Sequence, residues 1–464
     1  MKVEAGLEGA VTAALVAMVV VGGAAFAAFA IGAPVPDAVL PAALVAAAVL
    51  AWRRLRGRAA PPPMCTRDAW WCVAAAALLV AATAILAWGA LATPSRFWDG
   101  AAMWDVKAAL LAATPSLEQP TFRDPAVHCH SRDYPLLQPM LHALLERAVG
   151  CGRALFPALY ALQCGVLFVA MRRLGAAATT AALVAVAWGV TPMVLNPTSG
   201  GIDSGYADAL LAVAVTAMVA GLASRDHVWL AAGIALGVWV KPEGLVYGGL
   251  VVAAAWLRAD RALLRTAAWT WFAASGVWAV VQRDLQTLGS GPVPWALLAA
   301  LAVVGGVLPH VHARLGTVRT RLAVGVGVAL LLLVLGAANA GSGTWATYVA
   351  DPQRALGRLT SVPTITAELF GSAVTRGQFG LLFVLPLGLL FVRGGAPDRR
   401  WPGQWLVAAA LVLHAPFLLA PLDDLSGHLR ATMPRMLFHH LGVAALATGL
   451  LVDRMRPPAG EALA

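Results

Sequence analysis

Long apolar runs alternate with short polar segments along almost the whole 464-residue chain. The runs are rich in Ala, Val and Leu and do not alternate strictly with polar residues, so they do not resemble the strands of a β-barrel. A span needs about 20 apolar residues, and its backbone amides must be paired within the segment, so the runs predict transmembrane helices. We expect about fourteen, over residues 9–31, 37–52, 69–91, 151–171, 177–195, 207–223, 228–240, 243–257, 263–281, 294–311, 322–340, 377–392, 401–420 and 435–452.

The first of these runs has the position of a secretory signal peptide. Its apolar stretch is too long for one, and Glu4 and Glu8 interrupt the basic segment that a signal peptide requires. We therefore interpret it as a membrane span. With the second span it forms an N-terminal hairpin over residues 1–60.

Basic residues sit in short clusters between the apolar runs, for example at 53–58 and 399–400. Cytoplasmic loops are enriched in Lys and Arg, so these clusters predict that both termini face the cytoplasm. Residues 1–452 then form one transmembrane domain, and 453–464 form a cytoplasmic tail. The long segments 92–150, 341–376 and 421–434 become extracytoplasmic loops, which suggests that the protein works on its outer face.

Composition agrees with this interpretation, since 60% of the residues are hydrophobic and only 12% are charged, against about 25% charged in soluble domains. The net charge of +10 is distributed as topology signals and does not indicate nucleic-acid binding. Five cysteines do not make a disulfide framework. Cys129 and Cys151 both lie on the outer side in this topology, and the sequence leaves open whether they pair.

The first outer loop contains two clusters of polar residues. Asp99 follows the third helix within Trp98-Asp99-Gly100, where it is either part of a site at the membrane surface or an ordinary interfacial residue. The second cluster contains two histidines around a cysteine. Only one such cluster is visible, whereas structural zinc sites usually have two spaced ligand pairs, so a metal is not favoured. Its residues of interest are His130, Arg132, Asp133 and Tyr134.

Three further motifs place ionisable residues at helix ends. Asp203 and Asp208 flank Ser-Gly-Tyr-Ala, and Asp208 is close to the start of an apolar helix, where a carboxylate marks either a functional site or a paired contact. Lys241-Pro242-Glu243-Gly244 interrupts an apolar stretch, so Lys241 and Glu243 either pair with each other or belong to a site. Arg435 begins the last helix as an interfacial anchor or a phosphate ligand.

The chain contains five motifs in this order: Trp-Asp-Gly-x-x-x-Trp-x-x-Lys-Ala, Asp-Tyr-Pro-Leu-Leu-x-Pro, Gly-Tyr-Ala-Asp, Lys-Pro-Glu-Gly and Arg-x-x-x-His. Together they resemble the motifs of bacterial GT-C glycosyltransferases. The resemblance is to relatives of glycosyltransferase family 39, which includes protein O-mannosyltransferases and the lipid A aminoarabinose transferase, and it runs from about residue 94 to 440. It implies a GT-C-like helical bundle and a polyprenyl-phosphate sugar donor. It further implies that Asp99 is the catalytic carboxylate, that Asp208 is a second site carboxylate and that Lys241 contacts phosphate.

The chain departs from the family pattern in three places. Relatives often have Lys-Pro-Pro where this chain has Asp133-Tyr134-Pro135, and the second aspartate beside the catalytic one is missing. Asp105 is the nearest candidate for that second position. Two helices also precede the span that leads into the first outer loop.

The chemistry of such a reaction fits these residues. A phosphate leaving group needs positive charge rather than a proton, and Lys241, Arg435, Lys107 and Arg132 can supply it. The acceptor needs a base, and Asp99 can serve as one. Without a nucleotide diphosphate to chelate, the reaction requires no metal cofactor, and direct displacement inverts the anomeric carbon.

The sequence therefore predicts an inverting glycosyltransferase of the bacterial cytoplasmic membrane whose site faces the periplasm. Its partners are a polyprenyl-phosphate sugar, membrane lipids and a glycan, lipid or protein acceptor. Two alternatives remain: a polytopic transporter or flippase, indicated by the many spans and Asp208, and an envelope-glycan ligase or polymerase, indicated by Arg354, Arg358 and Arg376 in an outer loop. The sequence identifies neither the sugar nor the acceptor.

Overall fold

The computed structural model describes residues 2–56, 66–93, 99–124, 127, 134–195, 201–202, 204–258, 260–287, 307, 310–311, 352–387, 397–419 and 424–455. Within these ranges the chain is almost entirely helical and contains no strand, as expected for an all-α protein. The principal α-helices are α1 (Lys2–Ala30), α2 (Val39–Arg56), α3 (Thr66–Ala92), α4 (Val106–Ala113), α5 (Pro120–Arg123), α6 (Leu137–Val149), α7 (Leu155–Arg173), α8 (Ala178–Gly189), α9 (Pro192–Leu195), α10 (Asp208–Ser224), α11 (His227–Val240), α12 (Pro242–Leu257), α13 (Arg261–Thr287), α17 (Pro352–Gly357), α18 (Val362–Phe370), α20 (Trp401–Val412), α21 (Ala415–Leu419) and α22 (Leu425–Arg454). Short 3₁₀ or π segments are η1 (Gly100–Asp105), η2 (Gly152–Ala154), η4 (Arg358–Ser361), η5 (Gly371–Thr375), η6 (Leu385–Leu387) and η7 (Pro397–Arg400).

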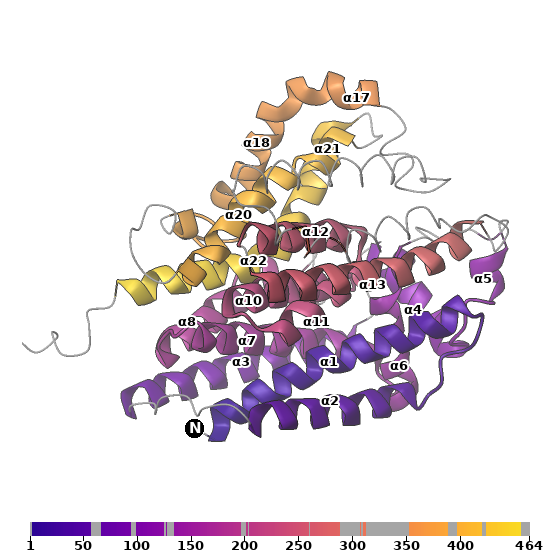
Figure 1. The fold of residues 1–464 in the computed structure, drawn as a ribbon, viewed down its shortest axis with the longest axis horizontal. Coiled ribbons are helices and arrows are strands. Elements are labelled where there is room, and N and C mark those ends of the chain that lie inside the picture. The colour runs from indigo at the N-terminus through magenta and orange to yellow at the C-terminus, as the bar shows by residue number, and fades with distance from the viewer. Residues whose placement is uncertain are drawn as a thin grey trace, which may run out of the picture.

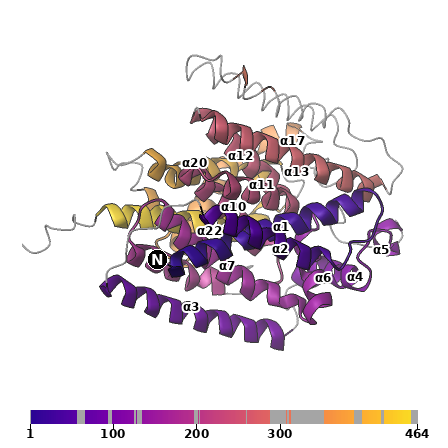
Figure 2. The same cartoon turned by 60° about the horizontal axis from the view of Figure 1, so that its bottom comes forward.

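The long helices lie side by side along the longest axis of the molecule (Figures 1 and 2). The start of α1 and the end of α22 lie at one end of this bundle, and α4, α5 and α6 lie at the other (Figure 1). Helix α10 occupies the centre, since every residue from Asp208 to Ala223 is buried. The first residue of α10 is therefore held at the core of the protein.

Five helical segments of the described chain are long and apolar enough to cross a membrane, namely Glu4–Ala30, Asp68–Ala92, Gly152–Arg173, Trp401–Leu419 and Leu425–Arg454. The described residues do not support fourteen spans. Four predicted spans correspond to shorter apolar helices, α8, α10, α11 and α12, of 12, 17, 14 and 16 residues, or about 18–26 Å at 1.5 Å per residue. Each is shorter than about 30 Å of hydrocarbon. The predicted spans 294–311 and 322–340 lie almost wholly outside the described residues.

The predicted span over 377–392 is wrong where the structure describes it. Residues 377–384 form turns, followed only by the short η6. Gly377 and Gly380 adopt positive φ values of 68° and 56°, and Pro386 cannot donate the backbone hydrogen bond that a continuous helix requires. Hydrophobic composition alone did not reveal these breaks.

The three predicted outer loops are largely helical. Most of the 421–434 segment belongs to α22, because the Asp424 side chain accepts a hydrogen bond from Gly427 N at 2.8 Å and caps the helix there. Segment 92–150 contains η1, α4, α5 and α6, and the described part of 341–376 contains α17, η4, α18 and η5. The segments between the predicted spans therefore contain helices wherever the structure describes most of their residues.

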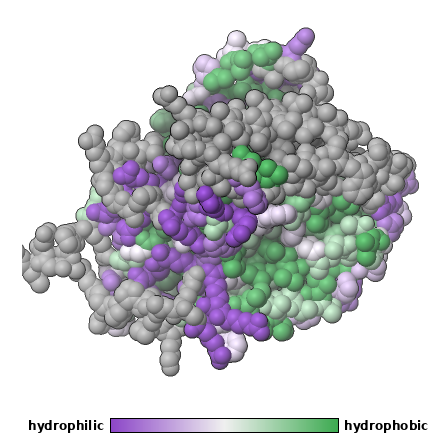
Figure 3. Space-filling view, viewed as in Figure 1, coloured by the Kyte–Doolittle hydropathy of each residue, from purple (hydrophilic) through white to green (hydrophobic). Residues whose placement is uncertain are grey.

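Helix α3 lies at the edge of the bundle, as Figure 2 shows. Its large apolar side chains are exposed, including Trp70 and Trp71 near one end and Trp88 near the other, which are 71%, 52% and 76% exposed. Tryptophan is enriched at both surfaces of a membrane. Figure 3 also shows a patch of hydrophobic residues right of the centre, beside hydrophilic residues in the centre and lower left. These surfaces are those of a membrane protein.

Candidate functional site

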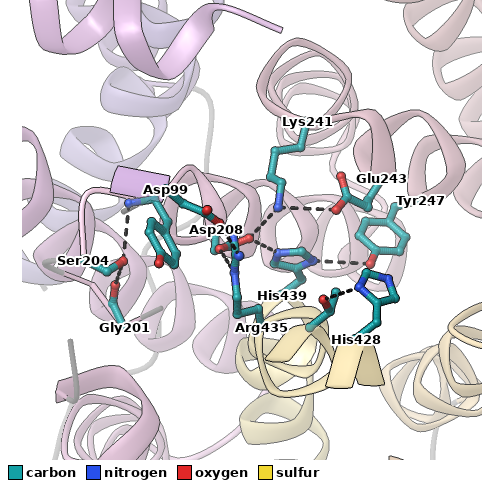
Figure 4. A network of polar contacts seen from close by, with 12 residues as sticks. Asp99, Gly201, Ser204, Asp208, Lys241, Glu243, Tyr247, His428, Arg435 and His439 are labelled. Atoms are coloured by element: carbon teal, nitrogen blue, oxygen red, sulfur yellow. Dashed lines mark hydrogen bonds and ion pairs between the residues drawn. The ribbon is translucent and has the colours of Figure 1, made fainter. Parts of the chain in front are cut away.

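The turn before α10 positions the most buried carboxylate among the described residues. Ser204 Oγ donates to the carbonyl oxygen of Gly201 at 2.7 Å and accepts a hydrogen bond from Tyr206 N at 3.3 Å (Figure 4). Gly205 has a φ of 82°, which favours glycine because it has no Cβ. This turn leads directly into Asp208 at the start of α10.

Asp208 is completely buried and has three cationic or hydrogen-bonding partners. Its Oδ1 lies 2.7 Å from Lys241 Nζ and 2.7 Å from His439 Nε2, and its Oδ2 lies 3.0 Å from Arg435 Nε (Figure 4). These partners come from the α11–α12 junction and from α22. A buried carboxylate is stable only when it is paired and hydrogen-bonded in this manner.

Arg435 connects this buried carboxylate to Asp99, which precedes η1. Arg435 Nη1 lies 2.6 Å from Asp99 Oδ2, and the guanidinium carbon lies 4.2 Å from the centre of the Tyr206 ring. The side chains of Asp99 and Arg435 are 23% and 22% exposed. The pair therefore forms an accessible edge, with Asp208 buried behind it.

Lys241 occupies the break between α11 and α12. It ends α11 in an extended conformation, with φ −152° and ψ 154°, and Pro242 begins α12, a position at which its missing N–H costs nothing. Lys241 Nζ also lies 3.3 Å from Glu243 Oε1, and one turn further along α12 Tyr247 Oη lies 3.3 Å from His439 Nδ1. The Lys241 side chain is only 7% exposed, so its ammonium group lies inside the protein, next to Asp208 and Glu243.

The connected ionisable side chains around Asp208 form one group, the Asp208 cluster: Asp99, Asp208, Lys241, Glu243, Arg435 and His439. It contains three carboxylates and two permanent cations, which leaves one negative charge when His439 is neutral. Beside it, burial raises the pKa of the Tyr206 hydroxyl, and the nearby carboxylates of Asp99 and Asp208 reinforce that shift, whereas Arg435 opposes it. Tyr206 thus stays a neutral phenol at physiological pH and can donate a hydrogen bond.

Two other residues predicted for the site lie elsewhere. Asp105 Oδ2 is 3.2 Å from Arg153 Nη1, and its Oδ1 is 3.5 Å from His142 Nδ1. Lys107 is 1% exposed, and its Nζ lies 5.8 Å from the centre of the Trp104 ring. Both residues follow Asp99 in sequence, but Asp105 contacts α6 and η2, and Lys107 lies beside Trp104 of η1.

Tyr134 lies in the same region, with its ring centroid 6.1 Å from that of Trp104. His130, Arg132, Asp133 and Asp203 lie outside the described residues. Cys151 is a free thiol, and Cys129 is outside the described ranges. Within those ranges no three His, Cys, Asp or Glu side chains converge as metal ligands do.

The sequence pattern assigned no role to His439, Tyr247 or Tyr206. A helical spacing could have identified the first two, because His439 is four residues after Arg435 and Tyr247 is four residues after Glu243, and side chains so spaced share one helix face. Tyr206 lies in the same short motif as Asp208. The stacking of its ring on Arg435 depends on the fold and has no sequence signature.

Comparison with known proteins adds no identification. No family model matches the chain, and no curated protein and no solved structure matches it either.

Proposed function

We propose that the protein transfers a sugar from a polyprenyl-phosphate donor to an acceptor at the extracytoplasmic membrane surface, within a GT-C-like bundle. The main support is the Asp99–Arg435 pair, in which a carboxylate and a guanidinium 2.6 Å apart share a partly exposed edge. Glycosyl transfer with phosphate departure needs a base for the acceptor and a fixed positive charge for the leaving phosphate, both close to one reacting carbon. The order of motifs around these residues gives the same assignment.

In this proposal Asp99 takes the proton of the acceptor hydroxyl or amine as that group attacks the anomeric carbon. The bond between that carbon and the phosphate oxygen breaks, and the phosphate leaves with the electron pair. Arg435 stabilises the departing phosphate, since guanidinium groups bind phosphate oxygens in a fork. The carbon is inverted by this single displacement.

Lys241 and Asp208 then act from behind the reacting groups. Asp208 accepts from Arg435 Nε at 3.0 Å and from Lys241 Nζ at 2.7 Å, so it fixes both cations in place. With 7% exposure, Lys241 adds positive potential without leaving its carboxylate partners. This arrangement preorganises charge before the substrate arrives, which is how electrostatic catalysis works.

The test measures release of free polyprenyl phosphate by the purified protein in nanodiscs, supplied with a panel of radiolabelled polyprenyl-phosphate sugars. We expect release with one donor and a loss of about 100-fold or more in Asp99→Asn, the usual contribution of a positioned base. Asp37→Asn is the matched control, since Asp37 also pairs with an arginine, Arg147 at 2.7 Å, but its side chain is 70% exposed. Full activity of Asp99→Asn would remove the proposed base.

One observation favours a second candidate, a transporter. A fully buried carboxylate lies against a break between two apolar helices, and transporters bind substrates and ions at such broken helices. Uptake of a sugar or ion into proteoliposomes, without any covalent product, would support this candidate over glycosyl transfer.

A further inference from the structure

His439 connects the buried carboxylate of the Asp208 cluster to a tyrosine. The imidazole is completely buried, with Nε2 2.7 Å from Asp208 Oδ1 and Nδ1 3.3 Å from Tyr247 Oη. A carboxylate only accepts hydrogen bonds, so Nε2 carries a proton. The tyrosine hydroxyl can donate to a bare Nδ1 or accept from a protonated one. His439 can therefore gain a proton at Nδ1 while every heavy atom stays in place.

The net charge of the cluster explains why His439 would take up a proton when an anion binds. Lys241 and Arg435 are each shared between two carboxylates, Lys241 between Asp208 and Glu243, and Arg435 between Asp208 and Asp99. With neutral His439 the cluster already has one negative charge in excess. An anion bound at the Asp99–Arg435 edge would raise that excess to two, in a poorly solvated place where repulsion is strong. An imidazolium at position 439 offsets the added charge.

We propose that binding of a phosphodiester anion at the Asp99–Arg435 edge is coupled to uptake of one proton by His439 Nδ1. The identity of the anion rests on the proposed function. The proton comes from bulk solvent, and the lone pair of Nδ1 accepts it. Tyr247 then changes from hydrogen-bond donor to acceptor, and the bond from Nε2 to Asp208 persists.

The described groups around His439 support this assignment. Asp208 faces it from α10, Glu243 and Tyr247 from α12, and Lys241 from the junction before α12, while Arg435 and His440 are on its own helix. The carboxylates favour an imidazolium, whereas burial, Lys241 and Arg435 oppose it, so the ring is neutral until a further negative charge is added. A bound phosphodiester would engage Arg435 and so tilt that balance toward protonation.

The neighbouring histidine is unsuited to the same task. His440 Nδ1 accepts a hydrogen bond from Trp405 Nε1 at 3.2 Å, and an indole N–H can only donate. Protonation at that nitrogen would bring two donors together. The described structure provides a protonation site with a reversible partner at His439 and not at His440.

The experiment is calorimetric titration of the full-length protein in nanodiscs with the methyl ester of polyprenyl phosphate, a diester that does not titrate near neutral pH. Repeating it in buffers of different ionisation enthalpy counts the protons taken up. We expect about one proton per bound diester for the wild type, by linkage, with an affinity that falls up to about tenfold per unit rise in pH. His439→Gln keeps a donor to Asp208 but cannot be protonated, so its uptake should approach zero. His227→Gln, at an exposed histidine, should match the wild type.

Tyr247→Phe gives a second measure that does not depend on the histidine variant folding well. It keeps the shape of the ring but removes the acceptor for a protonated Nδ1, so diester affinity and proton uptake should both fall. A side chain that only fills space would leave both unchanged. The slope of wild-type affinity against pH tests the same point without any substitution.

The possible failures can be told apart. Binding of the diester without proton uptake, or uptake that persists in His439→Gln, overturns the coupling and leaves the proposed function standing. Absence of any binding to the verified, folded wild type overturns the anion site itself, and the coupling with it.

Discussion

The carboxylate of Asp99 and the guanidinium of Arg435 lie 2.6 Å apart although 336 positions separate them in the chain. Asp99 directly precedes η1, Arg435 is the eleventh of the 30 residues of α22, and α10 lies between them in sequence. Arg435 also binds Asp208, so the partly exposed pair is backed by a buried one. The geometry of the site therefore depends on the buried contact as well as on the exposed one.

The first prediction concerns that buried contact. Asp208→Asn removes a fully buried negative charge that Lys241, Arg435 and His439 all contact. Removing one partner from a buried ion pair costs about 3 kcal/mol or more, because the remaining charges lose their compensation. Thermal unfolding in detergent or nanodiscs should show the loss. Asp37→Asn, at an exposed pair, should cost less than about 1 kcal/mol, and equal shifts for the two variants would contradict the prediction.

The second prediction concerns the close approach of α11 and α12. A Cβ on Gly244 would lie 1.8 Å from the carbonyl oxygen of Gly237, which is backbone and cannot rotate away. Gly244→Ala should therefore separate the two helices, displace Lys241 and cost about 3 kcal/mol or more, the upper range for overpacking. Gly249→Ala is the matched control on the same helix, since its Cβ would meet only Trp271 at 3.7 Å. Measured unfolding temperatures should differ clearly, and a tolerated Gly244→Ala would be inconsistent with this helix contact.

The third prediction concerns pH. Burial lowers the pKa of His142 to about 4, and the positive charge of Arg153 contributes. Asp105 lies 3.5 Å from His142 but is itself paired with Arg153, so it does not hold the histidine charged. The unfolded chain, with an ordinary pKa near 6.5, binds more protons than the folded one between those values. Stability should therefore fall as pH drops from about 6.5 to 4, by up to about 3 kcal/mol.

His142→Gln should flatten this acid limb, because the substituted side chain does not titrate. Unfolding temperature measured across the pH range for both proteins provides the comparison. If the stability of the variant fell with pH as steeply as that of the wild type, groups other than His142 would be responsible.

The fourth prediction separates two roles of Asp226. Its Oδ1 accepts from the backbone amides of Val228 and Trp229, both at 3.0 Å, and caps α11, while its Oδ2 pairs with Arg173 at 2.7 Å and with Arg54. Asp226→Asn keeps the cap and loses the charge, whereas Asp226→Ala loses both. We expect the alanine variant to be less stable than the asparagine variant by about 1 kcal/mol, the usual contribution of an N-cap. Equal unfolding temperatures for the two variants would show that the cap contributes nothing.

Part of this site could be predicted from the sequence. An ionisable residue in an apolar stretch is expensive unless it is paired, and that rule selected Asp208, Lys241 and Glu243, which the fold brings together. Asp105 was selected through the family resemblance and Lys107 as a source of positive charge, and the structure places Asp105 against Arg153 and His142 and Lys107 beside Trp104. Their direction depends on the π-helical turn of η1, and no local pattern encodes it.

The number of spans was less predictable for a related reason. Hydrophobicity indicates that a segment is buried, but not whether lipid or protein surrounds it. The apolar residues of α10, α11 and α12 are buried at least partly against other helices. A short apolar helix inside a bundle and a membrane span have similar compositions, so the pattern overestimated the crossings. Gly377, Gly380 and Pro386 provided a local indication of a break, and the apolar residues between them concealed it.

Helix α22 holds polar anchors at both ends of its apolar stretch. Arg435 is fixed by two carboxylates near one end, and Asp453 near the other end accepts from Ala177 N at 3.0 Å and pairs with Arg399 at 3.2 Å. About 27 Å of helix separates the two anchors, close to the hydrocarbon thickness of a bilayer. Both ends are tied to other parts of the protein, so a mismatch between the helix and the lipid is absorbed by the bilayer or by these contacts. The acyl-chain length of the surrounding lipid can therefore change the geometry of the Asp99–Arg435 edge through α22, without any contact between lipid and site.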